Sequence, residues 1–363
     1  MTGGRIGVGI IGVSVERGWG GLAHVPAIAR SPAFELVALS TSCKRTAQAA
    51  GEKYGVALAF DNHADLVAWP EVDLVVVTVK VPHHLELVTA AIGAGKAVYC
   101  EWPLGRNVAE AERMEAMAQS RGVRAFVGLQ GRSAPPLRYL RDLVREGYVG
   151  KVLSTTMIGS GAQWGATIDL ANAYTNDAST GATMLTIPMG HGIDALCWTL
   201  GEFDRITASA AVRRTRVGIE GTSESVTRTA ADQIAVSGVL ASGAVASVHY
   251  RGGLSRGTNL LWEINGSEGD LRLTADNGHL QIVPVTIEGT RGDAPLTPLV
   301  VPDDYVPVGD AESGRPYNLT QVYARLPGAL AGNEEELPTF TDAVCRHRLL
   351  ARIEQAAGFE RAL

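Results

Sequence analysis

Several features that would place a protein in a special class are missing from this 363-residue sequence. It has no run of 18 apolar residues, so no membrane-spanning helix is expected. Its four cysteines lie far apart with no CxxC pair, and the first residues lack a charged-then-apolar secretion signal. We therefore expect a cytoplasmic protein with reduced thiols. The net charge of −6 argues against a nucleic-acid surface.

Metal chemistry is also not predicted. His63, His249 and His279 have no partners at ligand spacing, and the cysteines are isolated. What remains is an ordinary globular composition, with 46% hydrophobic and 19% charged residues, in a chain long enough for two domains.

The first third alternates short apolar runs with helical segments. Continuous apolar runs suit strands that are buried on both faces of a parallel sheet. Such alternation predicts a doubly wound α/β domain over 1–130. The strands are expected at 5–12, 34–40, 72–79, 97–101 and 124–130, and the helices at 45–55, 83–95 and 107–122. Asn107 is the expected N-cap of the last helix and Gly122 its stop.

The rest of the chain has a different pattern. Runs that alternate polar and apolar residues, separated by Gly, Asn, Ser and Asp, indicate an α+β domain over 131–363 with an open, mostly antiparallel sheet. One strand is expected at 280–285, and a helix closes the chain at 341–359. Because one face of an open sheet must be solvated or covered, we expect a homodimer or homotetramer that pairs these sheets.

In a doubly wound sheet the ligand lies at the carboxyl ends of the strands. The loop at 12–24 has no strict G-x-G-x-x-G, since Ser14 stands where the second glycine would be. It still offers backbone N–H groups to a pyrophosphate at the start of the next helix. From this loop we expect cofactor contacts from Gly12, Val13, Ser14, Gly21 and His24.

The end of the second strand also lacks the acid that usually holds the ribose 2′-hydroxyl of NAD. The stretch 39–46 offers only small donors and two bases, which suits a 2′-phosphate or, alternatively, a capped helix start with a solvated basic pair. The sequence therefore favours NADP over NAD as cofactor. The residues expected here are Ser40, Thr41, Ser42, Lys44 and Arg45.

The order of motifs resembles the glucose–fructose oxidoreductase/inositol dehydrogenase family, and within it the branch that includes the fungal galactose-regulon inhibitor. The resemblance rests on the glycine loop and four further stretches: VVVTVKVPHHLE (75–86), AGKAVYCEWPL (94–104), MGHGIDAL (189–196) and WEINGSEGDLRL (262–273). It implies a Rossmann domain that binds NAD(P), with further cofactor contacts from Thr78, Val79, His84, Glu101, Trp102, Pro103 and Gln130. Regulatory members of the branch bind a dinucleotide as sensors.

The catalytic pattern of that family is incomplete here. Trp102 stands in place of the family's lysine, and Ile187 in place of an aspartate four residues before His191. His191 and Asp194 remain, at a spacing that places both on one helix face. His191 has an ordinary pKa suited to proton transfer, and Lys80 after an apolar strand is the other candidate. A purely structural histidine and a lysine that reaches solvent are the alternatives.

A substrate wall is expected from aromatic and polar side chains, namely Trp102, Arg132, Trp164, Tyr174 and His191. The first hypothesis is an NAD(P)-dependent oxidoreductase that transfers a hydride to or from a CH–OH carbon of a sugar, polyol or related molecule. The second is a non-catalytic dinucleotide-binding sensor that contacts another protein.

Overall fold

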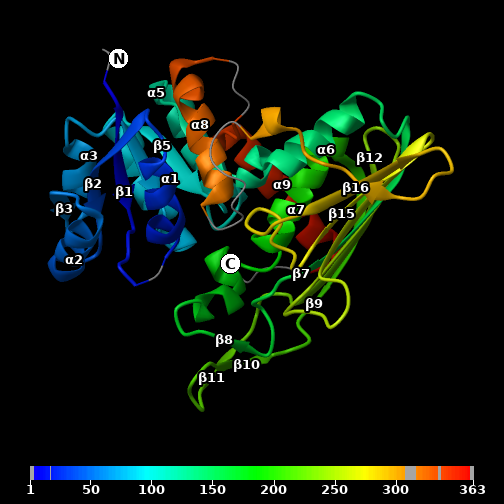
Figure 1. Ribbon diagram of the computed structural model, residues 1–363. Helices are drawn as coiled ribbons and strands as arrows, with labels where there is room; N and C mark the ends of the chain where they lie inside the picture. Colours follow the sequence, from blue (N-terminus) through cyan, green and yellow to red (C-terminus); the bar gives the residue numbers. More distant parts are fainter. Residues whose placement is uncertain (1–3, 17, 307–315, 334–336, 360–363) are drawn as a thin grey trace. The chain divides into compact units, whose positions relative to one another are not determined.

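The computed structural model describes residues 4–16, 18–306, 316–333 and 337–359. The chain forms two compact units (Figure 1). The first contains Met1–Ser133 and Pro307–Cys345, and the second contains Ala134–Val306 and Arg346–Leu363. The division after Ser133 lies close to the boundary expected at 130, but the return of residues 307–345 to the first unit was not expected.

The first unit is built on a six-stranded parallel sheet with the order β3-β2-β1-β4-β5-β6. Its strands are β1 (Ile6–Ile11), β2 (Phe34–Ser40), β3 (Leu58–Phe60), β4 (Leu74–Val77), β5 (Ala97–Glu101) and β6 (Ala125–Gly128). The chain order reverses between β1 and β4, which creates the switch point of a doubly wound fold. The predicted Rossmann architecture is therefore confirmed.

Helices of this unit connect and cover the strands. They are α1 (Val25–Ala29), α2 (Lys44–Tyr54), α3 (His63–Ala68), α4 (His84–Gly93), α5 (Val108–Arg121) and α8 (Tyr317–Ala331). The Asn107 side chain accepts a hydrogen bond from Glu110 N, and Gly122 ends α5 with a φ of 62°. Both predicted helix signals of α5 are therefore confirmed.

Helix α8 explains why a late segment belongs to the first unit. Leu319, Val322, Tyr323 and Leu326 are buried in the same hydrophobic core as β1 and β2. Burial of these side chains stabilises the packing of α8 in the first unit, because each buried apolar side chain contributes about 1.5–3 kcal/mol. No short-range pattern in the sequence reports such a long-range contact.

The second unit contains an eight-stranded sheet with the order β17-β16-β15-β14-β7-β13-β12-β9, in which only β7 and β13 pair in parallel. The strands are β7 (Val152–Ser160), β9 (Phe203–Ala211), β12 (Gln233–Leu240), β13 (Val245–Arg251), β14 (Leu260–Gly266), β15 (Gly269–Ala275), β16 (Thr286–Arg291) and β17 (Thr297–Pro298). A small sheet has the order β11-β10-β8, from β8 (Thr167–Ile168), β10 (Arg216–Ile219) and β11 (Ser225–Thr227). The helices are α6 (Pro135–Arg145), α7 (Pro188–Leu200) and the end of α9 (Phe340–Ala356).

The strand expected at 280–285 is wrong. Ile282 N and Val283 N both donate to His279 O, at 2.9 and 3.2 Å, so this segment turns, and β16 begins only at Thr286. Pro284 has no N–H to contribute to a ladder.

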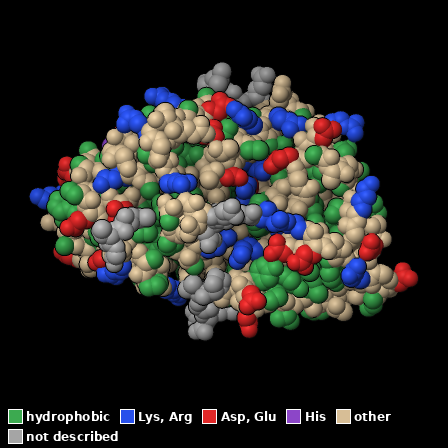
Figure 2. Space-filling model, turned by 90° about the horizontal axis from the view of Figure 1, so that it is seen from above, with side chains coloured by type: hydrophobic (Ala, Val, Ile, Leu, Met, Phe, Trp, Pro, Cys, Tyr) green, Lys and Arg blue, Asp and Glu red, His purple; other side chains and the backbone are tan. Residues whose placement is uncertain are grey.

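Three properties of the described residues bear on the kind of function to expect: membrane-spanning length, metal ligands and surface charge. Among the described residues, no helix is both long and apolar enough to cross a membrane, and no cluster of His, Cys, Asp and Glu suits a metal. On the face seen in Figure 2, Lys and Arg lie intermixed with Asp and Glu, so that face presents no continuous basic stripe.

Candidate functional site

A cavity of about 600 Å³ opens in the first unit, where the chain order of the sheet reverses. Ile11 ends β1, Ser40 ends β2 and Val79 follows β4, so the cavity lies at the carboxyl ends of these strands. Its volume is within the usual range for a ligand or cofactor site. The lining residues are Ile11, Gly12, Val13, Ser14, Val15, Ser40, Thr41, Ser42, Thr46, Asp61, Asn62, His63, Val79, His83, Glu86 and Leu87.

Gly12 forms the turn between β1 and this cavity. Its φ of 101° is one that favours glycine, and its N–H donates to Ser40 O at 3.0 Å. A Cβ at this position would lie 2.6 Å from Val79 Cγ1. Thr78 Oγ1 donates to Ile11 O at 3.1 Å and so joins the ends of β1 and β4. The backbone of the loop can therefore approach a ligand closely, as a pyrophosphate requires.

Helix α2 fixes the loop that follows Gly12. Tyr54 Oη donates to Ser14 O at 3.0 Å, and Lys53 Nζ donates to Val15 O. A Cβ on Gly21, in the π-helical turn Gly20–His24, would collide with Tyr54 Oη. Gly21 is thus needed for packing behind the loop, and it does not line the cavity.

Of the predicted cofactor residues, Gly12, Val13, Ser14, Ser40, Thr41, Ser42 and Val79 line the cavity. Lys44 and Arg45 are exposed in the first turn of α2 and are absent from its lining. Also absent are Gly21, His24, Thr78, His84, Glu101, Trp102, Pro103 and Gln130. The lining residues that the sequence reasoning missed are Ile11, Val15, Thr46, Asp61, Asn62, His63, His83, Glu86 and Leu87. Asp61 to His63 follow β3, which is only three half-buried residues long and gave no strand pattern.

His24 and Glu101 form a buried polar relay inside the first unit. His24 Nε2 lies 2.8 Å from Glu101 Oε1, and His24 Nδ1 lies 2.9 Å from Tyr323 Oη. The relay fixes the Glu101 carboxylate at the end of β5 and ties it to helix α8. His24 is fully buried and does not line the cavity, so it is not placed to contact a ligand there.

His84 is buried and does not line the cavity, whereas its neighbour His83 does. Burial lowers the pKa of His84, although its Nδ1 and Nε2 each lie 3.0 Å from a carbonyl oxygen, of Pro103 and Val79 respectively. The imidazole therefore ties the loop after β4 to the loop after β5. Trp102 in that second loop is 5% exposed and is joined to Pro103 by a cis peptide bond.

Other predicted residues of this unit are engaged or exposed. Arg132 Nη1 pairs with Asp342 Oδ1 at 2.7 Å, which occupies the guanidinium expected to bind substrate. Gln130 is 3% exposed in the turn Gln130–Ser133. Lys80 is exposed three residues after the end of β4, next to Val79, but it is not among the residues that line the cavity.

In the second unit, His191 and Asp194 share helix α7, and both are buried. Asp194 Oδ1 accepts from Arg346 Nε at 3.2 Å, and Arg346 also pairs with Glu202 at 2.8 Å. The carboxylate of Asp194, which remains from the family's catalytic pattern, is thus partnered by a buried arginine. Arg346 lies 152 residues away in the chain and was not identified from sequence.

Burial lowers the pKa of His191 to about 3, with Asp194 opposing the shift and His279 adding to it. His191 is therefore a neutral imidazole at physiological pH. Its pKa lies well below the near-neutral value that the sequence suggested. In this state His191 can offer one donor and one acceptor to a hydroxyl group.

The aromatic wall expected from the loop 161–181 is largely buried. Trp164 is 1% exposed, donates from Nε1 to Thr175 O at 3.2 Å, and stacks on His279 with ring centroids 6.0 Å apart. Tyr174 is half-buried, and burial raises its pKa. His279, which the sequence analysis set aside, thus belongs to the same buried cluster as Trp164.

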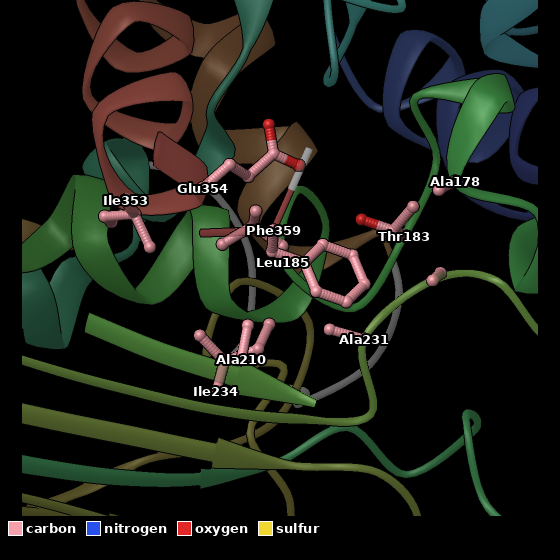
Figure 3. A pocket seen from close by; sticks show the side chains of 10 residues that line it. Ala178, Thr183, Leu185, Ala210, Ala231, Ile234, Ile353, Glu354 and Phe359 are labelled. Atoms are coloured by element: carbon pink, nitrogen blue, oxygen red, sulfur yellow. The ribbon is translucent and has the colours of Figure 1, made fainter. Parts of the chain in front are cut away.

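A second cavity lies in this unit under the C-terminal segment (Figure 3). Its free interior of about 10 Å³ has room for about one water molecule. Phe359 and Leu185 project into it beside small alanine side chains. The cavity is too small and too apolar to hold a hydroxylated substrate.

Comparison with protein families divides the chain in the same way as the sheets do. Residues 6–129 match the model of an oxidoreductase family with an NAD-binding Rossmann fold. Residues 135–275 match the C-terminal domain of Gal80p.

Individual relatives include both enzymes and regulators. Dehydrogenase AclE of Aspergillus oryzae is 35% identical over 220 residues, which span 57% of this chain and 58% of that enzyme. A super-repressor mutant of Gal80p from Saccharomyces cerevisiae has the same fold, with a TM-score of 0.88, 23% identity and coverage of 98% and 97%. Levoglucosan dehydrogenase in complex with NADH and levoglucosan gives a TM-score of 0.83 at 19% identity, with coverage of 98% and 97%.

Proposed function

Because residues 6–129 match an oxidoreductase family with an NAD-binding Rossmann fold and residues 135–275 match the C-terminal domain of Gal80p, we propose that this chain is an NAD(P)-dependent oxidoreductase. It transfers a hydride between nicotinamide and a CH–OH or carbonyl carbon of a sugar, polyol or related molecule. The observation that carries this proposal is the cavity of about 600 Å³ at the switch point of the parallel sheet.

The residues present fit a dinucleotide. Gly12 and Ser14 offer backbone to the pyrophosphate, while Thr41 and Ser42 offer hydroxyls to the ribose. The bound dinucleotide supplies the hydride chemistry. The absence of an acid at the end of β2 favours NADP(H) as the cofactor. Asp61, in the loop after β3, nevertheless places a carboxylate in the lining of the cavity, and an acid there favours NAD(H).

Lys80 is the candidate for proton transfer in the first unit, and His191 is the candidate hydrogen-bonding group in the second. Lys80 is exposed after β4 and so has access to water. Burial lowers the pKa of His191 to about 3, so the imidazole is neutral at physiological pH. It can donate or accept one hydrogen bond, but it does not readily take up a second proton.

The hydroxylated substrate class rests on one support. A protein of the same fold, levoglucosan dehydrogenase, has been solved with NADH and the sugar derivative in its name.

A non-catalytic dinucleotide sensor is the second candidate. Two observations favour it, namely Trp102 at the position of the family lysine and the ion pair that engages Asp194 with Arg346. The match of residues 135–275 to the Gal80p C-terminal domain supports the same candidate.

Steady-state rates separate the two. The wild type is assayed by dinucleotide absorbance on a panel of sugars and polyols, alongside Lys80→Ala, His191→Asn and the exposed control Lys44→Ala. An enzyme loses at least about a hundredfold in turnover from Lys80→Ala or His191→Asn while the control keeps its rate. Tight dinucleotide binding without turnover on any member of the panel would instead establish the sensor.

A second copy of the chain is the proposed partner, through the outer face of the eight-stranded sheet. On the half of the sheet that ends at β9, four small polar residues stand in register on neighbouring strands: Thr207, Ser237, Ser247 and Thr156. These small polar side chains leave a flat face that a symmetric copy can approach closely.

A further inference from the structure

The acid missing from β2 is supplied by the neighbouring strand. Strand β3 pairs in parallel with β2 so that Phe60 stands opposite Ser40, and Thr41 N donates to Phe60 O at 3.1 Å. Asp61, the next residue, therefore emerges at the same edge as Thr41, and both line the cavity. This edge is where Rossmann domains that bind NAD place a carboxylate against the ribose.

The charge of the cavity lining fits a ribose hydroxyl better than a phosphate. Among the described residues that line it, Asp61 and Glu86 are carboxylates, and none is lysine or arginine. Lys44 and Arg45 are exposed elsewhere on α2. A 2′-phosphate would bring about two further negative charges to this acidic edge, where no lining residue is lysine or arginine.

The N-terminus of α2 is also already engaged. Cys43 Sγ lies 3.1 Å from Thr46 Oγ1, which is in turn 2.7 Å from Thr41 Oγ1. The hydroxyl of Thr46 is the first cause that lowers the pKa of Cys43, and the charge of Arg45 adds to it. The Thr46 hydroxyl that lines the cavity is therefore already engaged by Thr41 and by the chain's own N-cap residue.

We infer that Asp61 accepts a hydrogen bond from the adenosine ribose and makes this chain select NAD(H) over NADP(H). The inference rests on the proposed function, because it requires that the cavity bind a nicotinamide dinucleotide. It reverses the preference for NADP that the sequence suggested. That preference followed from the absence of an acid on β2, and the structure supplies an acid from the loop after β3.

The test is calorimetric titration of the whole chain with NADH and with NADPH. The wild type is expected to bind NADH at least tenfold more tightly than NADPH, and Asp61→Asn is expected to reduce that ratio at least fivefold. Glu35→Gln is the matched control, because it removes the same charge from an exposed residue at the opposite end of β2. The double variant Lys44→Ala, Arg45→Ala should keep the wild-type ratio.

Three results would overturn the inference while leaving the proposed function intact. They are NADPH binding as tight as NADH, an unchanged ratio in Asp61→Asn, and loss of NADPH binding alone in the Lys44→Ala, Arg45→Ala variant. Failure of the folded chain to bind either dinucleotide would overturn the proposed function and this inference together.

Discussion

Acid should destabilise the second unit through His191, a buried imidazole on α7. Its pKa is about 3 in the folded chain, against an ordinary value of 6.5, because burial disfavours the charged form. The unfolded chain therefore binds a proton at a higher pH than the folded chain does. Stability is fully present above pH 6.5 and declines as the pH falls towards 3.

The magnitude follows from these two pKa values. Each pH unit between them changes the free energy of unfolding by about 1.4 kcal/mol. Going from pH 7.5 to pH 5.0 should therefore cost about 2 kcal/mol through His191 alone. Asp194 and His279 are the ionisable groups that face it, and the pKa of His279 is itself lowered by burial. His84 in the first unit adds a loss of the same sign.

The assay is urea unfolding at pH 7.5 and 5.0, followed by tryptophan fluorescence and by circular dichroism. His191→Asn should lose about 2 kcal/mol less than the wild type over this interval. His83→Asn, which replaces an exposed histidine, should lose as much as the wild type. Equal acid losses in His191→Asn and the wild type would refute the assignment of a buried, neutral imidazole.

Three further predictions concern packing and assembly. Trp102→Lys should lower the free energy of unfolding by about 3–5 kcal/mol, because the side chain of Trp102 is only 5% exposed. It should leave turnover no higher than in the wild type. The melting temperature tests the first outcome, and the steady-state rate tests the second. Asp194→Ala should lower the free energy of unfolding by about 3–5 kcal/mol, because it leaves Arg346 buried with Glu202 as its remaining ion-pair partner. Adding Arg346→Met should restore part of that stability in urea unfolding. A double variant no more stable than Asp194→Ala would argue against the buried ion pair. Light scattering at micromolar concentration should show that the wild type is a dimer or tetramer. Ser247→Arg, on the face of the eight-stranded sheet, should convert this oligomer to a monomer. A monomeric wild type would exclude the proposed pairing.

The local features of the fold were predictable from sequence because their causes are local. The apolar runs at 34–40 and 97–101 coincide with β2 and β5, and Asn107 and Gly122 bound α5 as their backbone preferences require. The return of α8 to the first unit was not predictable, because the burial of Leu319 and Tyr323 depends on contacts with distant strands.

The site was less predictable, because side chains from separate segments decide its charge. Lys44 and Arg45 come soon after β2 but do not line the cavity, whereas Asp61 follows a three-residue strand that gave no pattern. In the same way, nothing near Asp194 in the sequence announces Arg346 as its partner. Periodicity reports which face of an element is buried, but it does not report which distant charge meets it.

The central claim is that the cavity of the first unit holds one nicotinamide dinucleotide. Ser42 is exposed and lines that cavity, while Lys44 is exposed two residues later and does not. Titration of NADH into the wild type, Ser42→Trp and Lys44→Trp by calorimetry tests the claim most directly. The account predicts one site per chain in the wild type and in Lys44→Trp, with at least tenfold weaker binding in Ser42→Trp. Wild-type affinity in Ser42→Trp, or no binding of NADH or NADPH to the folded wild type, would contradict it.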